Sequence, residues 1–302
     1  MKKIFITCFL VLGLALLMFA CAPSFKAVKA TEATHQKGGG RLISSDGYKF
    51  SYRFYPSSQK SPSVIYIPGL GGRVAWGGNR GGYELASPLN KANFNFIGFD
   101  RSDVLLDYPG QRQALKHLAK RSKSGSTYFP TIDGKYSSAE SIVQNEVSSI
   151  IELIEKSPTR DPEKGIYLIG ASMGSWLSLV AVHSFPNKIK GVVFLSPAIL
   201  PEWVTTEAKN PQINIKNYWL SLVSSFGKQR PALAIGNKKD IIAPSMSKDG
   251  SSLDGAQLLK KEIGPNVEVM EASSSLHSGE LVANSREVRE KIVQWLIEMV
   301  SG

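Results

Sequence analysis

Cysteine is scarce in this sequence. Of its 302 residues only Cys8 and Cys21 are cysteines, and both lie within the first 21 positions. The chain from Ala22 onward therefore has no disulfide, no cysteine nucleophile and no cysteine-based metal site. With 42% hydrophobic and 20% charged residues, the sequence also lacks the biased composition of disordered, collagen-like or disulfide-stapled proteins. Its length suits one large domain or two small ones, and allows a substantial buried core.

The first 22 residues have the pattern of an export signal. Lys2 and Lys3 precede an apolar run over residues 4–20, and small residues follow it. The end of this run, Met18-Phe19-Ala20-Cys21, resembles the lipobox of a bacterial lipoprotein, although Phe19 replaces the small residue usual at that position. Ordinary cleavage after Ala22 and an uncleaved membrane anchor are the alternatives. All three interpretations place the folded domain outside the cytoplasm.

We therefore expect three parts in the chain. The first is a signal peptide over residues 1–21 with Cys21 as the lipidation site. A flexible tether over residues 22–40 follows, because these residues are small, polar and basic and end in three glycines. The third is a folded domain over residues 41–302. We expect the protein in the cell envelope, attached to the membrane through its N-terminal lipid or anchor and facing the periplasm or the cell surface, rather than secreted freely.

Positive charge exceeds negative charge in this chain. It has 36 Lys and Arg residues against 25 Asp and Glu, which gives a formal net charge of +11. In an exported protein, the anionic partners this favours are phospholipid headgroups or acidic polymers. The densest basic run, residues 116–123, has no aromatic residues interleaved with it. We therefore expect no nucleic-acid partner.

Short apolar runs of strand type alternate with helix-like stretches along the rest of the chain. An Asp46-Gly47 turn between residues 41–45 and 48–55 indicates a hairpin. Strands that alternate with helices indicate an α/β fold, a parallel sheet with helices on both faces, and no repeat divides it into two domains. The other expected strands are 63–67, 94–99, 165–169, 191–195, 232–235 and 267–270, and the expected helices are 83–92, 138–156, 173–185 and 288–300.

One motif in the sequence carries chemistry. The apolar strand over residues 165–169 leads into Gly170-Ala171-Ser172-Met173-Gly174 and then into an apolar helix. A serine on so sharp a strand-to-helix turn needs glycine on either side, and the turn presents its hydroxyl above the sheet. The backbone N–H of Met173, at the start of the helix, then faces the oxyanion that develops in acyl transfer. Ser172 is the candidate nucleophile.

Histidine is also rare, so the base that a serine nucleophile needs can be sought by elimination. Of the four histidines, His35 lies in the expected tether and His117 lies in the basic segment upstream of the nucleophile. His183 is on the same expected helix as Ser172, about 16 Å away along its axis. His277 remains. It follows the last expected strand by a few residues, in the kind of loop where α/β sites form.

The candidate acid is Asp240, just past the expected strand over residues 232–235 and a glycine turn. It is the only carboxylate between Glu207 and Asp249. An ordinary surface aspartate in a turn beside two lysines is the alternative interpretation. Glu202 and Asp249 are the alternative acids.

With these residues in order, the chain from about residue 41 to residue 302 resembles the α/β-hydrolase fold family, whose triad runs serine, acid, histidine. The resemblance implies a mostly parallel eight-stranded sheet with helices on both faces. The family places an oxyanion loop after its third strand, and the corresponding stretch here is residues 67–72, with Pro68 in place of the usual histidine. The backbone N–H of Leu70 is the candidate second oxyanion donor beside that of Met173.

The resemblance implies a serine hydrolase that cleaves carboxylic esters, similar to a carboxylesterase or lipase. Its substrate would be a small-molecule or lipid ester, and no metal or organic cofactor is implied. Peptidases, thioesterases and acyltransferases share the fold and the chemistry, and a non-catalytic binding protein on the same fold is the alternative from another class.

The sequence leaves little room for a cap over the site. Only about 30 residues separate Leu200 from Pro231, where many members of the family insert a large helical cap. Apolar residues at positions 219, 222, 223 and 226 follow the spacing of one helix face and predict a single short helix. This helix either covers the acyl group as a small lid or packs at the edge of the sheet. We therefore expect a minimal cap.

Overall fold

The computed structural model describes residues 27–33, 35–45, 47, 49–69, 80–100, 128–130, 136–138, 143–198, 215–227, 230–240 and 251–302. Several residues singled out in the sequence lie outside these ranges. They are Cys21 with the whole signal peptide, residues 22–26 of the expected tether, Asp46 of the expected turn, Leu70, His117 with the basic run, and the alternative acids Glu202 and Asp249.

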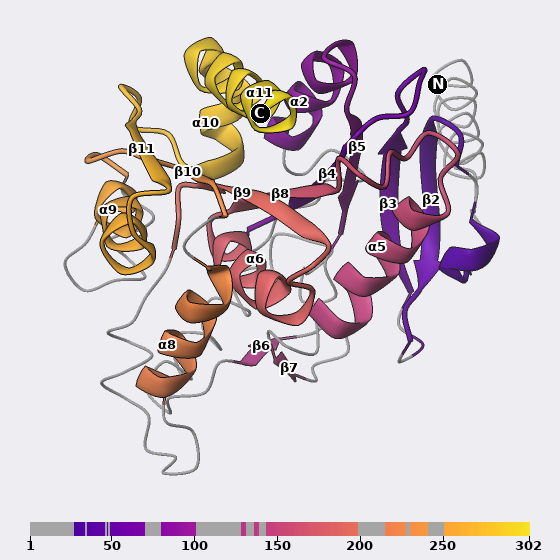
Figure 1. Ribbon diagram of the computed structural model, residues 1–302, viewed down its shortest axis with the longest axis horizontal. Coiled ribbons are helices and arrows are strands. Elements are labelled where there is room, and N and C mark those ends of the chain that lie inside the picture. The colour runs from indigo at the N-terminus through magenta and orange to yellow at the C-terminus, as the bar shows by residue number, and fades with distance from the viewer. Residues whose placement is uncertain are drawn as a thin grey trace, which may run out of the picture.

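The fold is built on one nine-stranded sheet, which Figure 1 shows nearly edge-on. All neighbouring strands are parallel except β3, which is antiparallel to both β2 and β5. A separate antiparallel pair is formed by β6 (Tyr128–Pro130) and β7 (Tyr136–Ser138). The order in the main sheet is β1 (Ala27–Val28), β2 (Gly38–Ile43), β3 (Lys49–Tyr55), β5 (Asn95–Phe99), β4 (Ser63–Ile67), β8 (Ile166–Ala171), β9 (Ile189–Leu195), β10 (Ala232–Gly236) and β11 (Val267–Glu271).

The central strands are buried along their whole length. Every residue of β4, β5, β8 and β10 is buried, which explains why the sequence shows them as continuous apolar runs without alternation. Successive side chains point to opposite faces of the sheet and enter two separate cores. In β9, Phe194 belongs to one core, whereas Val193 and Leu195 belong to the other.

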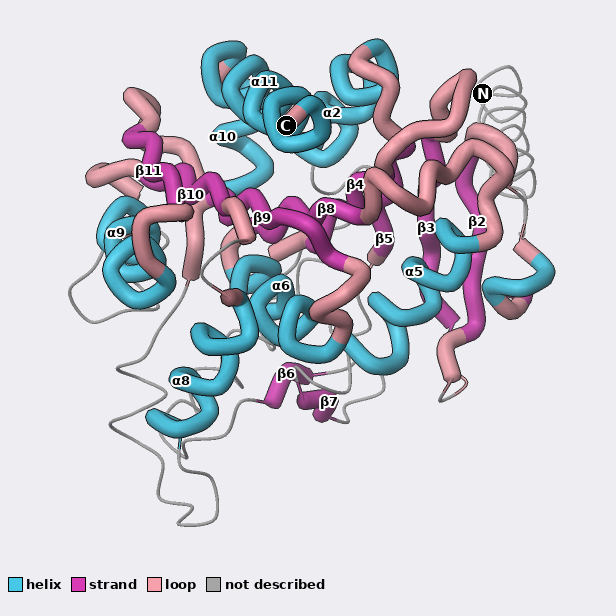
Figure 2. The backbone as a smooth tube through the Cα atoms, in the orientation of Figure 1, coloured by secondary structure: helices cyan, strands magenta, loops and turns pink. Residues whose placement is uncertain are grey.

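Helices cover both faces of the sheet, as Figure 2 shows. Leu85, Leu281 and Trp295 form one core with the sheet, and Leu177 and Leu259 contribute to the other. The expected fold class is thereby confirmed, although the main sheet has nine strands and not the eight expected. On one face lie α2 (Arg80–Lys91), α10 (Ser278–Asn284) and α11 (Arg286–Ser301), and on the other lie α5 (Ser148–Glu155), α6 (Met173–Ser184), α8 (Ile215–Phe226) and α9 (Ser252–Ile263).

The N-terminal segment departs from the expected tether. Residues 27–28 form β1, the edge strand of the main sheet, and β2 already begins at Gly38. Between them a 3-10 turn, η1 (Ala30–Glu32), buries Ala30, and His35 Nε2 lies 3.0 Å from the carbonyl oxygen of Leu153. The boundary expected at residue 41 therefore lies too late.

One of the three glycines that suggested flexibility, Gly40, has a packing role instead. A Cβ at Gly40 would lie 2.7 Å from the Tyr52 ring, so glycine lets this ring lie across the neighbouring strand. Composition cannot separate such a glycine from one in a flexible linker, because both occur in polar, glycine-rich stretches.

Helix α8 confirms the short helix expected near residue 222. Leu222 and Phe226 are fully buried, and the Phe226 ring lies 5.9 Å from that of Phe194 in β9. Ser225 Oγ also lies 2.5 Å from His183 Nδ1 in α6. These contacts favour a helix that packs on the sheet over a small lid that covers the acyl group.

Two helices beside the site were not predicted. Helix α9 contains Gly255, which lowers helix propensity, and α10 has only seven residues. Gly255 is explained by packing, because a Cβ there would lie 2.5 Å from the carbonyl oxygen of Pro197. The expected helix over residues 138–156 begins too early, because Ser138 ends β7, and residues 139–142 lie outside the described residues. The rest of it is a π-helical turn, η2 (Val143–Val147), followed by α5.

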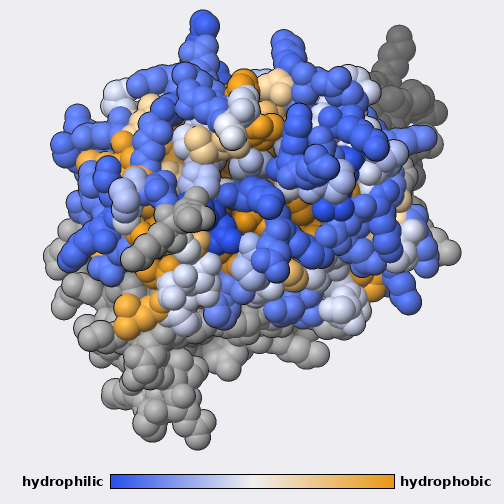
Figure 3. Space-filling view, viewed as in Figure 1, coloured by the Kyte–Doolittle hydropathy of each residue, from blue (hydrophilic) through white to orange (hydrophobic). Residues whose placement is uncertain are grey.

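The surface is mostly polar in the view of Figure 3, with apolar residues scattered among polar ones. Among the described residues, the large hydrophobic side chains that stay exposed are Leu220 in α8 and Ile297 in α11. None of the described helices combines the length and the apolarity needed to cross a bilayer.

Candidate active site

Ser172 occupies the sharp turn between β8 and α6. Its backbone has φ 54° and ψ −119°, a conformation that costs free energy in any residue with a side chain. The turn is fastened to the sheet, because Ser172 N–H donates to the carbonyl oxygen of Leu195 in β9 at 2.8 Å. Only 5% of Ser172 is exposed. The strained backbone, the hydrogen bond to β9 and the burial together indicate that the fold holds the Ser172 hydroxyl in a fixed position.

Glycine is required on both sides of Ser172. A Cβ at Gly170 would lie 2.3 Å from Ser178 Oγ and 2.5 Å from the carbonyl oxygen of Gly174. A Cβ at Gly174 would lie 2.2 Å from the carbonyl oxygen of Ile67, at the end of β4. The glycines predicted from the motif thus let α6 and β4 approach the turn closely.

The segment after β4 also reaches the nucleophile turn. A Cβ at Gly69 would lie 2.8 Å from Ser172 Cβ and 3.5 Å from Ser172 Oγ. On the other side, Met173 is the first residue of α6, so no carbonyl of the helix can accept its N–H. Backbone at the end of β4 and at the start of α6 therefore flanks the hydroxyl. Leu70 directly follows Gly69 but lies outside the described residues.

His277 and Asp240 are joined by a short hydrogen bond. His277 Nδ1 donates to Asp240 Oδ2 at 2.6 Å, although the two residues are 37 positions apart. The Asp240 side chain is fully buried and that of His277 is 10% exposed. In the neutral imidazole, a proton on Nδ1 leaves the lone pair on the other ring nitrogen, Nε2.

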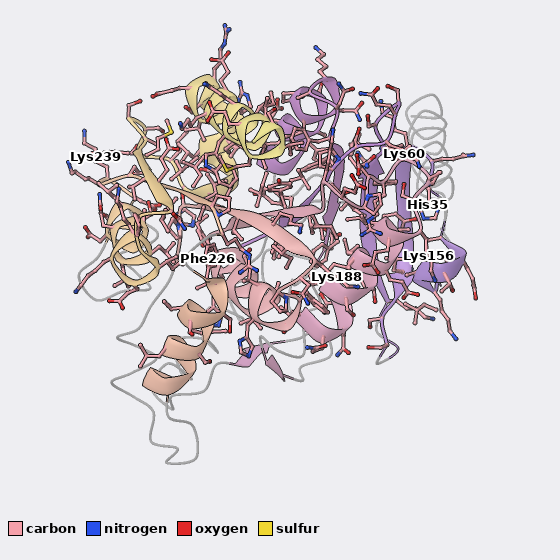
Figure 4. The ribbon with its side chains drawn as sticks, in the orientation of Figure 1. His35, Lys60, Lys156, Lys188, Phe226 and Lys239 are labelled. Atoms are coloured by element: carbon pink, nitrogen blue, oxygen red, sulfur yellow. The ribbon has the colours of Figure 1, made fainter. Side chains whose placement is uncertain are left out.

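Asp240 is therefore no ordinary surface residue in a turn. Its neighbours Lys238 and Lys239 are exposed, and Figure 4 shows Lys239 at the outer edge of the molecule. Lys238 pairs at the surface with Glu271, at 3.0 Å. The turn thus sends its lysines outward and its carboxylate inward.

Backbone contacts bring His277 to the same edge of the sheet as Ser172. Ser172 N–H bonds Leu195, and the next residue, Ser196, accepts a hydrogen bond from Ser278 N–H at 2.8 Å. His277 Nε2 is buried and has no hydrogen-bond partner among the described residues. The bond between base and nucleophile is often long before a substrate binds.

A family model for the alpha/beta hydrolase fold matches residues 62–239, which is more than half of the chain. The chain belongs to the α/β-hydrolase fold family. No curated protein matches the sequence.

Several solved structures resemble the chain over most of its length. Est1E from Butyrivibrio proteoclasticus, determined with ferulic acid bound, has a TM-score of 0.56 at 15% identity and covers 86% of this chain and 99% of its own. A highly thermostable carboxyl esterase from Bacillus coagulans has a TM-score of 0.56 at 12% identity, with 88% and 99% covered. The esterase Pf2001 from Pyrococcus furiosus has a TM-score of 0.57 at 16% identity, with 91% and 97% covered. At these identities the likeness establishes the fold.

Within this α/β-hydrolase fold, the other described histidines make contacts away from Ser172. His35 bonds Leu153 in α5, and His183 bonds Ser225 in α8. The described residues contain no group of three or more His, Cys, Asp or Glu side chains that could hold a metal ion.

Sequence reasoning missed two residues beside the site, Ser196 and Asn237. Each follows a buried strand directly, Ser196 after β9 and Asn237 after β10. Asn237 Nδ2 donates to the carbonyl oxygen of Leu276 at 2.9 Å, just before His277. A polar residue directly after a buried parallel strand was the signal in the sequence, since sites of α/β folds form there.

Proposed function

We propose that this protein is an exported serine hydrolase that cleaves carboxylic esters with Ser172, His277 and Asp240. The observation that carries the proposal is the 2.6 Å bond from His277 to the buried Asp240, at the edge of the sheet that holds the strained turn of Ser172. In such an arrangement the Asp240 carboxylate polarises the His277 ring, which can then take the proton of the Ser172 hydroxyl.

Each residue has a separate role in the proposed reaction. Ser172 Oγ attacks the acyl carbonyl carbon while His277 Nε2 takes the hydroxyl proton, and His277 then returns that proton to the leaving alcohol. Asp240 holds the imidazole in the required tautomer and stabilises the imidazolium. The backbone N–H groups of Met173 and Leu70 stabilise the oxyanion. Water, activated by the same histidine, then releases the acid from the acyl-enzyme.

A fluorophosphonate tests this assignment directly. Ser172 Oγ would attack phosphorus, fluoride would leave, and His277 would take the proton, so the adduct needs the same base as ester cleavage. Intact-mass analysis of the domain from Ala22 onward should show one adduct. Labelling should be lost in Ser172→Ala and slowed about 10⁴-fold or more in His277→Ala and Asp240→Ala. A folded protein that gives no adduct, or an adduct in Ser172→Ala, would refute the triad. The alternative of a non-catalytic binding protein on the same fold would then be favoured.

Ester bonds are the proposed substrate class. Two of the similar proteins, from Bacillus coagulans and Pyrococcus furiosus, are esterases by name. A panel of matched esters, thioesters and peptide amides should show turnover of esters first, and faster turnover of amides would point to a peptidase. Added alcohol would reveal an acyltransferase through the ratio of new ester to free acid.

A further inference from the structure

The backbone on both sides of His277 is held by buried side chains. Asn237 Nδ2 donates to the carbonyl oxygen of Leu276 at 2.9 Å, and Ser278 N–H donates to Ser196 Oγ at 2.8 Å. The residue before His277 is thereby tied to the loop after β10, and the residue after it to the loop after β9. Together with the bond to Asp240, three contacts from two neighbouring strands hold one histidine.

Ser196 adopts a costly conformation in order to make its contact. It is fully buried and has φ 46°, in the left-handed region that glycine occupies more easily. Its own N–H donates to the carbonyl oxygen of Ile235 at 2.7 Å, which fixes the residue to β10. A glycine would relieve the backbone but would leave Ser278 N–H, at the start of α10, without this acceptor.

Asn237 is equally well anchored. It is 1% exposed, and its backbone N–H donates to Ser252 Oγ at the start of α9, at 3.0 Å. Helix α9 also lies against Pro197, where Gly255 permits the close approach, and it lies against Gly236. Helix α9 thus supports both the loop after β9 and the loop after β10, which hold the backbone on either side of His277.

We propose that Ser196 and Asn237 are positioning residues for His277. They fix the imidazole so that Nδ1 stays on Asp240 while Nε2 stays available to Ser172, and they act only through the histidine. This inference rests on the proposed function. A misplacement of about 1 Å in a catalytic group can cost about 100-fold in rate, so loss of either hydrogen bond should slow catalysis by about 10- to 100-fold.

The first test compares fluorophosphonate labelling rates and melting temperatures in Ser196→Ala, Ser196→Gly and Asn237→Ala. Ser285→Ala is the matched control, because Ser285 Oγ also accepts from a backbone N–H, that of Val288 at the start of α11, at 3.3 Å. All variants should lose some stability, but only the first three should label slowly. Since Ser196→Gly removes the hydroxyl without the backbone strain, equal slowing in the glycine and alanine variants assigns the effect to Oγ.

A spectroscopic readout separates positioning from a general loss of stability. The proton in the short bond between His277 and Asp240 should give a downfield ¹H NMR signal, recognised by its absence in His277→Ala. This signal should broaden or vanish in the three positioning variants and persist in Ser285→Ala. If a Ser196 variant does not fold, Asn237→Ala tests the same prediction at the other end of the segment.

The outcomes distinguish this inference from the proposed function beneath it. Wild-type labelling rates in folded Ser196→Ala and Asn237→Ala would overturn the positioning roles while leaving the triad intact. Slow labelling with an unchanged NMR signal would also overturn them, because the effect would then not pass through His277. Fast labelling of His277→Ala would refute the triad itself, and the positioning roles with it.

Discussion

Among the described residues, three non-glycine residues with positive φ stand at the carboxyl edge of the sheet: Ser172, Ser196 and Ser278, with φ of 54°, 46° and 51°. Each such residue costs about 1–3 kcal/mol, so three of them near one histidine are not expected by chance. All three are serines, and two of them make the hydrogen bond that borders His277. The fold concentrates its backbone strain where the proposed chemistry takes place.

Ser172 itself should limit the stability of the protein. Ser172→Ala and Ser172→Gly both remove the hydroxyl, but only glycine relaxes the turn at φ 54°. After allowance for the greater freedom of glycine in the unfolded chain, the glycine variant should be about 1 kcal/mol more stable than the alanine variant. Urea unfolding measures this difference. A glycine variant less stable than the alanine variant by about 0.4–1 kcal/mol, the cost of glycine's greater freedom in the unfolded chain, would mean that the turn stores no strain at this residue.

At the scale of the elements, the two cores on either side of the sheet explain which predictions succeeded. Strands such as β4 and β8 are buried on both faces, so their apolar runs stand out in the sequence. Helix α9 and the N-terminal segment bury only part of their surface and contain glycines that packing requires. Their sequences therefore resemble loops.

The N-terminal segment offers a direct test of the corrected boundary. Ala30 is 3% exposed in η1, whereas its neighbour Thr31 is exposed. Ala30→Asp should cost about 1–3 kcal/mol because it buries a polar group without a partner. Thr31→Asp adds the same charge to the same turn and should change stability by less than about 0.5 kcal/mol. If both variants lower the stability equally in thermal unfolding, the expected flexible tether would be the better description of this segment.

At the scale of the whole molecule, the early start of the fold bears on the attachment to a membrane that the sequence led us to expect. Only five residues separate Cys21 from Ala27, the first residue of β1. Six peptide steps span at most about 20 Å. An acylated Cys21 would thus hold the folded domain close to the bilayer. The expected tether of residues 22–40 would have allowed a greater distance between the domain and the bilayer.

Removal of the proposed lipidation site should release the protein. Cys21→Ser should move the chain from the membrane fraction to the soluble fraction, with the fluorophosphonate labelling rate unchanged, because the site lies in the folded domain. Mass spectrometry of the N-terminal peptide of the unaltered protein should show the acyl groups. Retention of Cys21→Ser in the membrane would favour the uncleaved anchor, and a soluble unaltered protein would favour ordinary cleavage after Ala22.

Local sequence determined much about this protein. The glycines around Ser172 and the apolar runs on either side define the nucleophile turn, since sharp turns and buried strands depend on neighbouring residues. Rarity of histidine singled out His277, and the order of the three residues identified the family that the match over residues 62–239 confirms.

Tertiary structure alone decided the rest. The bond between His277 and Asp240 joins residues 37 positions apart, and the bond between Ser196 and Ser278 joins residues 82 positions apart. No periodicity encodes such pairs, because parallel strands bring distant loops together only once the sheet has formed. For the same reason Gly255 could not be assigned in advance, because the close contact that it permits is with Pro197, a residue distant in sequence.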